Sequence, residues 1–355
     1  MSVFFIAEAG VNHNGDKDMA FRLIDAAVEA GADAVKFQTF NADALASESA
    51  PKAAYQNETT DAEESQLEML RRLELPRAWH FELRDYCIDN GIAFLSTPFD
   101  SVSLAFLNDE LGLETIKVPS GEVTNGPFLL EIARTGRNII LSTGMSTLDE
   151  VRAALGVLAF GLTGGNETPS LDAFAAAFDG ADGQKALKDK VTVLHCTSAY
   201  PTPLADANVA AMVTMRDTFA LKTGFSDHTE GDTASLTAAA LGADVIEKHF
   251  TLDRSLPGPD HKASLEPDAL GALIRDIRAV ETALGDGIKT PCEIEADTRR
   301  VVRKSLTALD DVAEGAELTA QSLGAMRPGS GTSPMHYWEH IGRPAPRALK
   351  KGDLL

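Results

Sequence analysis

FSDHTEGDTASLTAAALGADVIEKHFTLD, residues 225–253, is the stretch that decides the fold. An apolar run ends in the polar residues of FSDHT, a helix-period segment follows from Gly231, and a second apolar run ends on Glu247 and His249. A hydrophobic core gains nothing from polar residues at the end of a buried strand. In a barrel of alternating strands and helices, however, the strand ends face one shared pocket. The stretch therefore predicts a strand–helix–strand unit whose polar ends belong to a site.

The same unit recurs along the first three quarters of the chain. Six further apolar runs end in polar residues: FFIAEAGVNHNG, AVKFQTF, IAFLSTPFD, TIKVPSGE, IILSTGM and VTVLHCTSAYP. Segments with helical spacing lie between them, and most close on a glycine, as helix C-caps do. Strand and helix alternate eight times, and no GxGxxG turn follows the first strand. The pattern favours an α/β fold of the closed (β/α)8 TIM-barrel type over an open doubly wound sheet.

The length of 355 residues accommodates one barrel of about 250 residues and a smaller module. We expect the barrel over residues 1–285, a polar linker over 286–300, and a small β-rich domain over 301–355, where short strand-like pieces alternate with Gly and Pro turns. Residues 41–64 follow the second strand on the catalytic side and form a candidate lid. The long connection near 161–190 returns to the opposite face of the barrel and is interpreted as decoration.

Charge and cysteine content limit the classes of partner. The formal net charge of −21 repels phosphate backbones, so we expect no nucleic acid partner, and an anionic substrate has to be held by local cations. Cys87, Cys196 and Cys292 have neither metal-binding nor redox spacing, which favours a reducing compartment. No apolar run approaches the ~18 residues that a membrane span needs, and no signal segment precedes the first strand. The sequence therefore predicts a soluble cytoplasmic protein without a membrane partner.

Two histidines at neighbouring strand ends form a candidate metal site. His228 and His249 follow consecutive strands, so their imidazoles can converge, and with added oxygen ligands they suit Mn²⁺, Zn²⁺ or Co²⁺. The alternative is that both are buried histidines that only form hydrogen bonds. Glu247 shares a strand face with His249 and can orient it or accept a proton.

Two lysines at strand ends are candidates for anion binding. Lys36 and Lys117 end the second and fourth strands, where a buried lysine without a ligand would be costly. They are read as anion ligands or Schiff-base nucleophiles, and the alternative is a solvated surface position. Hydroxyls and turn N–H groups surround them and suit phosphate or carboxylate oxygens. The hydroxyl side chains are Thr97, Ser120, Ser142 and Ser226.

Three carboxylates complete the candidate set. Glu8 and Glu122 end the first and fourth strand units, and a carboxylate near anionic ligands serves as a proton carrier or a polyol ligand. For Glu122 the alternative is a charge at a helix N-terminus. The loop 251–264 has a Pro-Gly-Pro turn that presents Asp260, and its place beside the histidines favours substrate contact over a merely stiff connection.

Taken together, AEAGVNHNG, KFQTF, STPFD, KVPSGE, STGM, HCTSAYPTP, FSDHT and EKHFTLDRSLPGPDHKAS resemble the sialic acid synthase family of nonulosonic acid synthases. The tail containing MRPGSGTSPMHYWEHIGR and ALKKGDLL is similar to that family's antifreeze-like (SAF) domain. The resemblance implies condensation of phosphoenolpyruvate with an N-acylated mannose-type sugar. The sugar would be N-acetylmannosamine or its 2,4-diacetamido-2,4,6-trideoxy analogue, and the products a nine-carbon 2-keto acid and phosphate.

The resemblance also implies roles for the residues. Phosphoenolpyruvate would be held by Lys36, Thr97, Lys117, Ser120, Ser142 and Ser226, with Ser198 of HCTSAYP and Glu247 as further substrate contacts. His228 and His249 would bind a divalent ion, Mn²⁺ first and Mg²⁺ or Co²⁺ as alternatives. The sugar would contact Gln38, Tyr200 and Asp260, with Glu8, Glu122 and His249 as the catalytic groups. Arg327 would reach the barrel of a partner subunit, which implies a domain-swapped homodimer.

Two other classes stay open on the sequence. A metal-dependent aldolase or isomerase on the same barrel would act without phosphoenolpyruvate, so phosphate release separates it from a synthase. The tail could also bind ice without any enzymatic role, but that needs a flat Thr and Ala surface, whereas this tail carries the charged loop of Arg327.

Overall fold

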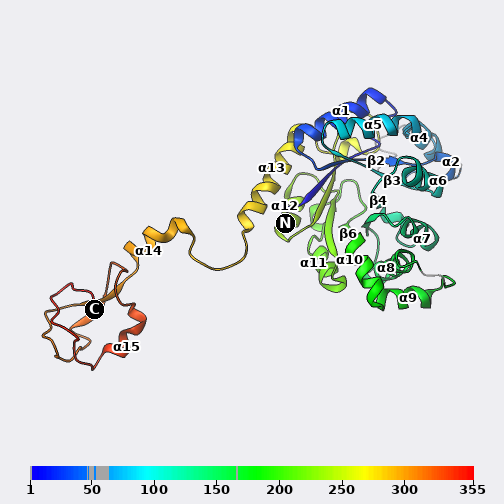
Figure 1. Ribbon diagram of the computed structural model, residues 1–355. Coiled ribbons are helices and arrows are strands. Elements are labelled where there is room, and N and C mark those ends of the chain that lie inside the picture. The colour runs from blue at the N-terminus through cyan, green and yellow to red at the C-terminus, as the bar shows by residue number, and fades with distance from the viewer. Residues whose placement is uncertain (1, 46, 48–51, 53–63, 165–166) are drawn as a thin grey trace. The chain divides into compact units, whose positions relative to one another are not determined.

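The computed structural model describes residues 2–45, 47, 52, 64–164 and 167–355. The chain divides into two compact units, Met1–Gly285 and Asp286–Leu355. In the first unit eight parallel strands lie inside a layer of helices, which confirms the predicted TIM-type fold (Figure 1). The hydrogen-bonded order is β3-β2-β1-β8-β7-β6-β5-β4, and β3 and β4 pack against each other without a regular ladder. The barrel is therefore closed by packing at this one seam.

Strands and helices alternate as the hydrophobic pattern predicts. The strands are β1 (Phe4–Gly10), β2 (Ala34–Thr39), β3 (Ala93–Pro98), β4 (Thr115–Val118), β5 (Asn138–Ser142), β6 (Val191–Cys196), β7 (Lys222–Asp227) and β8 (Val245–His249). The helices of this unit are α1 (Lys17–Ala30), α2 (Ala42–Leu45), α4 (Gln66–Leu73), α5 (Arg77–Asp89), α6 (Ser101–Ala105), α7 (Gly126–Arg134), α8 (Leu148–Leu162), α9 (Leu171–Asp179), α10 (Ala181–Lys190), α11 (Ala210–Phe219), α12 (Thr233–Ala240) and α13 (Pro267–Leu284). Capping boxes begin α4 at Ser65 and α8 at Thr147, so their first backbone N–H groups have partners.

The inside of the barrel has two layers of opposite character. Side chains alternate between the two faces of a strand, so residues two apart both point inward. The layer near the strand starts is apolar and consists of Ile6, Ala34, Leu95, Ile140, Leu194 and Val245. Two residues further along, the same strands present Glu8, Lys36, Thr97, Ser142, Cys196 and Glu247. Strands β4 and β7 add Lys117 and Ser226 to this polar layer, where both donate to Glu247. The apolar layer closes the bottom of the barrel and leaves the polar layer facing the C-terminal mouth.

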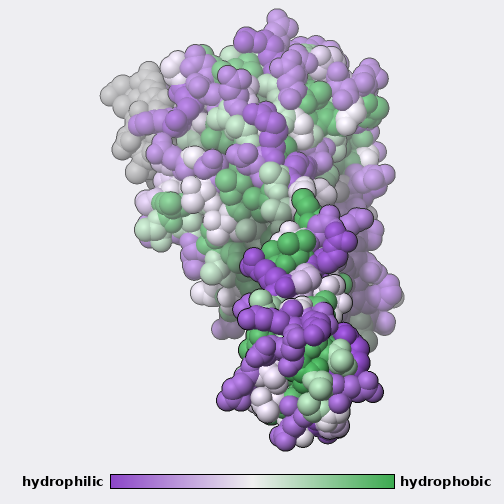
Figure 2. Space-filling view, turned by 90° about the vertical axis from the view of Figure 1, so that its left-hand side faces the viewer, coloured by the Kyte–Doolittle hydropathy of each residue, from purple (hydrophilic) through white to green (hydrophobic). Residues whose placement is uncertain are grey.

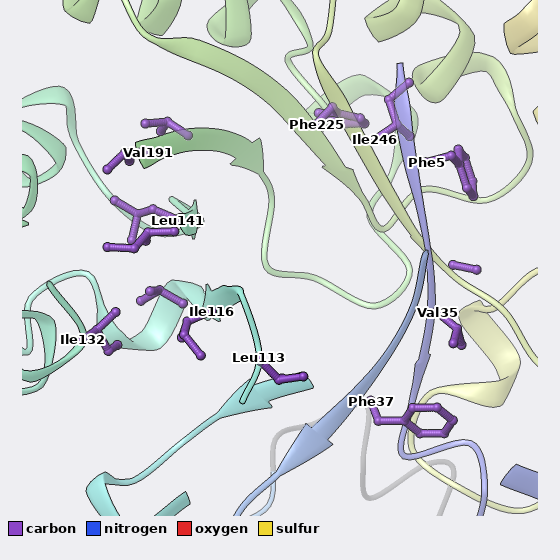
Figure 3. Packing of buried hydrophobic residues seen from close by; sticks show 14 of the residues in the cluster. Phe5, Val35, Phe37, Leu113, Ile116, Ile132, Leu141, Val191, Phe225 and Ile246 are labelled. Carbon is purple, nitrogen blue, oxygen red and sulfur yellow. The ribbon is translucent and has the colours of Figure 1, made fainter. Parts of the chain in front are cut away.

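The main hydrophobic core lies between the strands and the helices. It is built from the outward side chains of the strands, among them Phe5, Val35, Phe37, Phe225 and Ile246, which appear as purple sticks in Figure 3. All five are at most 1% exposed. β-branched and aromatic residues pack well on a pleated surface, and this shell anchors the strands whose ends carry the polar residues.

The long connection near 161–190 forms α9 and α10, which pack on α8. Most of the predicted lid, residues 41–64, lies outside the described residues. Within the described ranges no helix is both long and apolar enough to cross a membrane. The face seen in Figure 2 carries hydrophilic residues (purple) interspersed with hydrophobic ones (green).

The second unit has its own small core. It contains α14 (Ala296–Val302), the antiparallel strands β9 (Ser305–Ala308) and β10 (Leu323–Met326), and the short helix α15 (Tyr337–His340). Buried apolar side chains join the sheet to the following turns: Leu306, Ala308, Val312, Leu318, Leu323, Ala345 and Leu349. The segment expected to be a linker, 286–300, contains most of α14.

Candidate active site

A cavity of about 430 Å³ opens at the C-terminal ends of the strands. It brings together fourteen of the residues singled out in the sequence: Glu8, Lys36, Gln38, Thr97, Lys117, Ser120, Ser142, Ser198, Tyr200, Ser226, His228, Glu247, His249 and Asp260. A larger cavity of about 690 Å³ lies at the opposite mouth, among the strand starts Thr115, Asn138 and Lys222. TIM barrels place their chemistry at the C-terminal face, so the smaller cavity is the candidate active site.

Two lysines and two glutamates form a buried ionic network in the polar layer. Lys36 Nζ lies 2.6 Å from Glu8 Oε2 and 3.5 Å from Glu247 Oε2. Lys117 Nζ donates to both oxygens of Glu247, at 2.7 and 3.0 Å. All four side chains are at most 5% exposed. The hydroxyl of Ser226 donates to Glu247 at 2.9 Å, and Lys36 donates to Thr97 at 3.0 Å. The two cations are thus fixed on one shared carboxylate.

The two glutamates of this network differ in their ionisation. Burial raises the pKa of Glu8 from 4.5 to about 7, although Lys36 opposes the shift. Burial also disfavours the charged form of Glu247, but Lys117 and Lys36 outweigh it and hold the pKa of Glu247 well below its usual range. Glu247 therefore stays anionic at neutral pH, whereas Glu8 is divided between its protonated and ionised forms. A carboxyl with a pKa near the working pH is suited to proton transfer.

The two histidines converge as neutral imidazoles. Their ring centroids are 5.7 Å apart, and the ring of Tyr200 lies 4.2 Å from that of His228. Burial lowers the pKa of His228 to about 4 and that of His249 well below its ordinary value. His228 Nδ1 donates to the carbonyl of Thr197 at 2.8 Å, which leaves the lone pair of Nε2 available. His249 Nδ1 is buried without a hydrogen-bond partner, 3.8 Å from Asp260 Oδ2.

Small side chains form a narrow recess beside Lys117. A Cβ atom on Gly144 would lie 2.9 Å from Ser120 Oγ, 2.8 Å from Cys196 Sγ and closer still to Ser198 Oγ. The N–H of Gly144 donates to Ser120 Oγ at 2.9 Å. Ser142 Oγ is buried without a hydrogen-bond partner. Such an orphan hydroxyl, in the same cavity as two fixed cations, is a ready donor for an anionic oxygen.

One wall of the cavity is apolar, and the sequence pattern gave no warning of it. Helices α2 and α4 and the loops after β1, β2 and β3 contribute Val11, Phe40, Leu45, Met69, Leu70, Leu73 and Phe99, named here the apolar wall. The signal available in the sequence was the amphipathic spacing of α4, which is equally typical of a helix that only covers the core. Cys196 also lines the cavity, and no spacing pattern marks a lone cysteine at a strand end.

Two predicted residues do not line this cavity. Glu122 is half-buried in the turn after β4, and its carboxylate accepts a hydrogen bond from Asn125 Nδ2 at 2.6 Å. Arg327 is exposed in the second unit, where its Nε donates to the carbonyl of Val302 at 3.0 Å. A catalytic role for Glu122, a contact of Arg327 with a partner subunit, and the domain-swapped homodimer stay predictions.

The barrel, the buried cations and the paired imidazoles define a barrel enzyme with a site for an anionic substrate. The chain matches the NeuB family over residues 23–289 and belongs to it.

Named relatives cover nearly the whole chain. It is 46% identical over 99% of its length to the N,N'-diacetyllegionaminic acid synthase of Campylobacter jejuni and 42% identical over 100% to that of Legionella pneumophila, covering 98% and 94% of those proteins. It also resembles the solved structure of an N-acetylneuraminic acid synthetase from Leptospira borgpetersenii, with 31% identity, a TM-score of 0.69, and coverage of 84% of this chain and 90% of that one.

Proposed function

We propose that this protein is a nonulosonic acid synthase. It condenses phosphoenolpyruvate with an N-acylated, mannose-type amino sugar and yields a nine-carbon 2-keto sugar acid and phosphate. The observation that carries the proposal is the convergence of two buried cations, Lys36 and Lys117, and two neutral imidazoles, His228 and His249, in one cavity. Its membership in a family with named synthases supports the same reaction.

The anionic substrate is held by the polar layer. Lys36 and Lys117 with ionised Glu247 leave an excess of one positive charge when Glu8 is protonated, so a dianion entering the site meets a favourable field despite the acidic chain. Ser142, Ser120 and Ser198 donate to its oxygens in the recess next to Gly144. The lysines act by fixed electrostatics rather than as Schiff bases, because an ion-paired ammonium is a poor nucleophile and phosphoenolpyruvate needs no such activation.

His228 and His249 hold a divalent cation in this proposal. Both rings are neutral; His249 Nδ1 is buried without a hydrogen-bond partner, and the nearest side-chain contact of His228 Nε2 is Ser226 Oγ at 3.5 Å, which donates its proton to Glu247. In the described part of the chain no cluster of three or more His, Cys, Asp or Glu side chains could bind a metal, so oxygens of solvent and sugar have to complete the shell. That mixed set suits Mn²⁺, with Mg²⁺ or Co²⁺ as substitutes, better than a closed zinc site. When bound, the ion supplies Lewis-acid polarisation of the sugar aldehyde.

The remaining side chains orient the sugar and handle protons. Gln38, Tyr200 and Asp260 lie around the imidazoles and can contact the hydroxyl and acylamino groups of the open-chain sugar. Glu8 is the proton carrier in this proposal, because its pKa of about 7 allows it to exchange a proton with the substrate at neutral pH. Glu122 is retained as a second candidate for that role.

The apolar wall favours a deoxygenated, doubly acylated sugar. A 6-deoxy, 2,4-diacetamido sugar presents three methyl groups, whereas N-acetylmannosamine presents one methyl group and hydroxyls at carbons four and six. Each buried methyl group contributes about 0.8 kcal/mol. We therefore assign 2,4-diacetamido-2,4,6-trideoxymannose as the substrate and a legionaminic acid as the product, in line with the names of the relatives from C. jejuni and L. pneumophila.

Phosphate release tests the proposal directly. The purified protein is incubated with Mn²⁺, phosphoenolpyruvate and each sugar in turn, and then with both sugars in competition. We expect sugar-dependent phosphate release, with kcat/KM higher for the diacetamido sugar. Failure of both sugars would exclude the synthase. Turnover of a sugar without phosphoenolpyruvate would instead identify an aldolase or isomerase.

A further inference from the structure

A buried ion pair lies behind the two imidazoles, outside the candidate active site. Lys248 stands between Glu247 and His249 on β8 and points away from the barrel interior, where it is 1% exposed. Its Nζ lies 2.8 Å from Asp227 Oδ2 and donates to the carbonyl of Thr229 at 2.8 Å. Lys248 thus ties the end of β8 to the segment that follows β7.

Asp227 is the centre of this arrangement, named here the clasp (Asp227, Thr229, Ser235 and Lys248). Its Oδ1 accepts from the N–H and the hydroxyl of Thr229 at 2.8 and 2.7 Å, and its Oδ2 accepts from Ser235 Oγ at 2.5 Å as well as from Lys248. Ser235 belongs to α12, so the clasp joins two strand ends and a helix. All four side chains are at most 2% exposed.

The clasp fixes the backbone on both sides of His228 and directly before His249. Asp227 and Thr229 are the chain neighbours of His228, and Thr202 N–H also donates to the carbonyl of His228 at 2.8 Å. A buried ion pair is a poor way to gain stability, because well-packed apolar residues of similar volume often do as well or better. What a fully satisfied pair provides instead is one fixed geometry.

We infer that Asp227 and Lys248 are positioning residues that set the separation of His228 and His249 for the divalent ion. This inference rests on the proposed function, since it assigns the ion to these imidazoles. Neither side chain lines the cavity, so neither touches the substrate. Residues that orient metal ligands from behind typically change metal affinity by 10–100-fold when they are replaced.

The test measures Mn²⁺ affinity by the electron paramagnetic resonance signal of the free ion, in the full-length protein without substrates. The variants are Lys248→Met, Asp227→Asn and the double substitution. Ile246→Ala is the matched control, because Ile246 lies on the same strand, points to the same outer side and is fully buried. Thermal unfolding of each variant is followed in parallel.

We expect about tenfold or greater weakening of Mn²⁺ binding in both single variants and unchanged affinity in Ile246→Ala, although that control also loses stability. The double variant regains thermal stability relative to the single variants, because no buried charge is left unpaired, but its Mn²⁺ affinity stays low. If the clasp only stabilised the fold, the double variant would recover its thermal stability and its Mn²⁺ affinity together.

Wild-type affinity in the single variants, or recovery of affinity along with stability in the double variant, would overturn the inference. If Lys248→Met does not fold, the comparison of Asp227→Asn with Ile246→Ala decides. If the wild-type protein binds no Mn²⁺ either alone or after addition of the sugar, the metal site of the proposed function fails and the inference falls with it. That outcome is distinct from a wild-type protein that binds Mn²⁺ and variants that bind it equally well.

Discussion

The two interior layers of the barrel lie two residues apart on the same strands, yet they contribute to stability in opposite directions. The apolar layer, with Ile140 and Leu194, removes hydrocarbon from water and needs no specific partner. The polar layer, with Lys36, Lys117 and Glu247, remains buried only because each charge meets an opposite one within 2.6–3.5 Å. The first layer stabilises the fold, and the second gives up stability for a preorganised site.

Replacing Lys117 with methionine should have the largest effect on activity. The change removes one of the two cations, while Glu247 keeps Lys36 and Ser226 as partners, so the protein should fold. Loss of a preorganised electrostatic contact costs about 10²–10³ in turnover, and we expect the upper end in a dry site. Steady-state phosphate release measures the loss. Lys222→Met, an exposed lysine at the opposite mouth, is the control, and equal loss there would contradict the assignment.

Truncating the apolar layer should produce the reverse pattern. Leu194→Ala deletes a fully buried side chain and should lower the free energy of unfolding by about 2–5 kcal/mol. At a temperature where the variant is folded, its KM for phosphoenolpyruvate should be unchanged, because Leu194 has no access to the cavity. Urea unfolding and kinetics on the same sample make the comparison. A large rise in KM without loss of stability would show that the two layers are not separate.

The sequence predicts the polar layer well for a simple physical reason. Strand residues alternate strictly, so a polar residue two positions after an apolar one, as Glu247 after Val245, has to face inward beyond it. Parallel strands then bring all such residues to one mouth, which is why fourteen candidates from eight strand units lie in one cavity. The TIM-type barrel follows from the same alternation of strand and helix.

The alternation of residues along a strand does not predict where a side chain in a turn points or what a helix packs against. Lys117 lies on β4 and Glu122 follows that strand, but the turn directs the carboxylate of Glu122 to Asn125. The apolar wall arises because α4 places Met69 and Leu70 over the mouth, and amphipathic spacing does not say what a helix covers. The partner of Lys248 is equally hidden, since Asp227 lies on a different strand.

Outside the barrel interior, a buried polar residue should affect stability alone. His80 on α5 is fully buried against Thr39, and burial lowers its pKa from 6.5 to about 4. Between these values the unfolded chain binds a proton that the folded chain does not, so stability is full above pH 6.5 and falls as the pH falls. His80 should account for about 2 kcal/mol of loss at pH 5. Urea unfolding at pH 7.5 and 5 should show a smaller difference for His80→Leu than for the wild type.

The recess of the polar layer can be filled without touching a charge. Gly144→Ala would place a methyl group among Ser120, Cys196 and Ser198, where no space exists for it. We expect about a tenfold rise in the KM for phosphoenolpyruvate, equivalent to ~1.4 kcal/mol, with little change in the KM for the sugar. Gly126→Ala, at a position outside the cavity with open space for a Cβ atom, is the control. An equal rise in the KM for both substrates would contradict the assignment of the recess to phosphoenolpyruvate.

The smallest expected effect concerns the apolar wall, which places apolar side chains at the mouth of the barrel, beside the polar layer. Leu70 is only half-buried on α4 and lines the cavity, so Leu70→Gln should keep the helix and the fold. Loss of one methyl contact is worth about 0.8 kcal/mol, which lowers the ratio of kcat/KM for the diacetamido sugar over N-acetylmannosamine about fourfold. Arg71→Gln, exposed on the same helix, should leave the ratio unchanged. An unchanged ratio in Leu70→Gln would mean that the wall excludes water without reading the sugar, and the choice of sugar would then depend on the polar side chains alone.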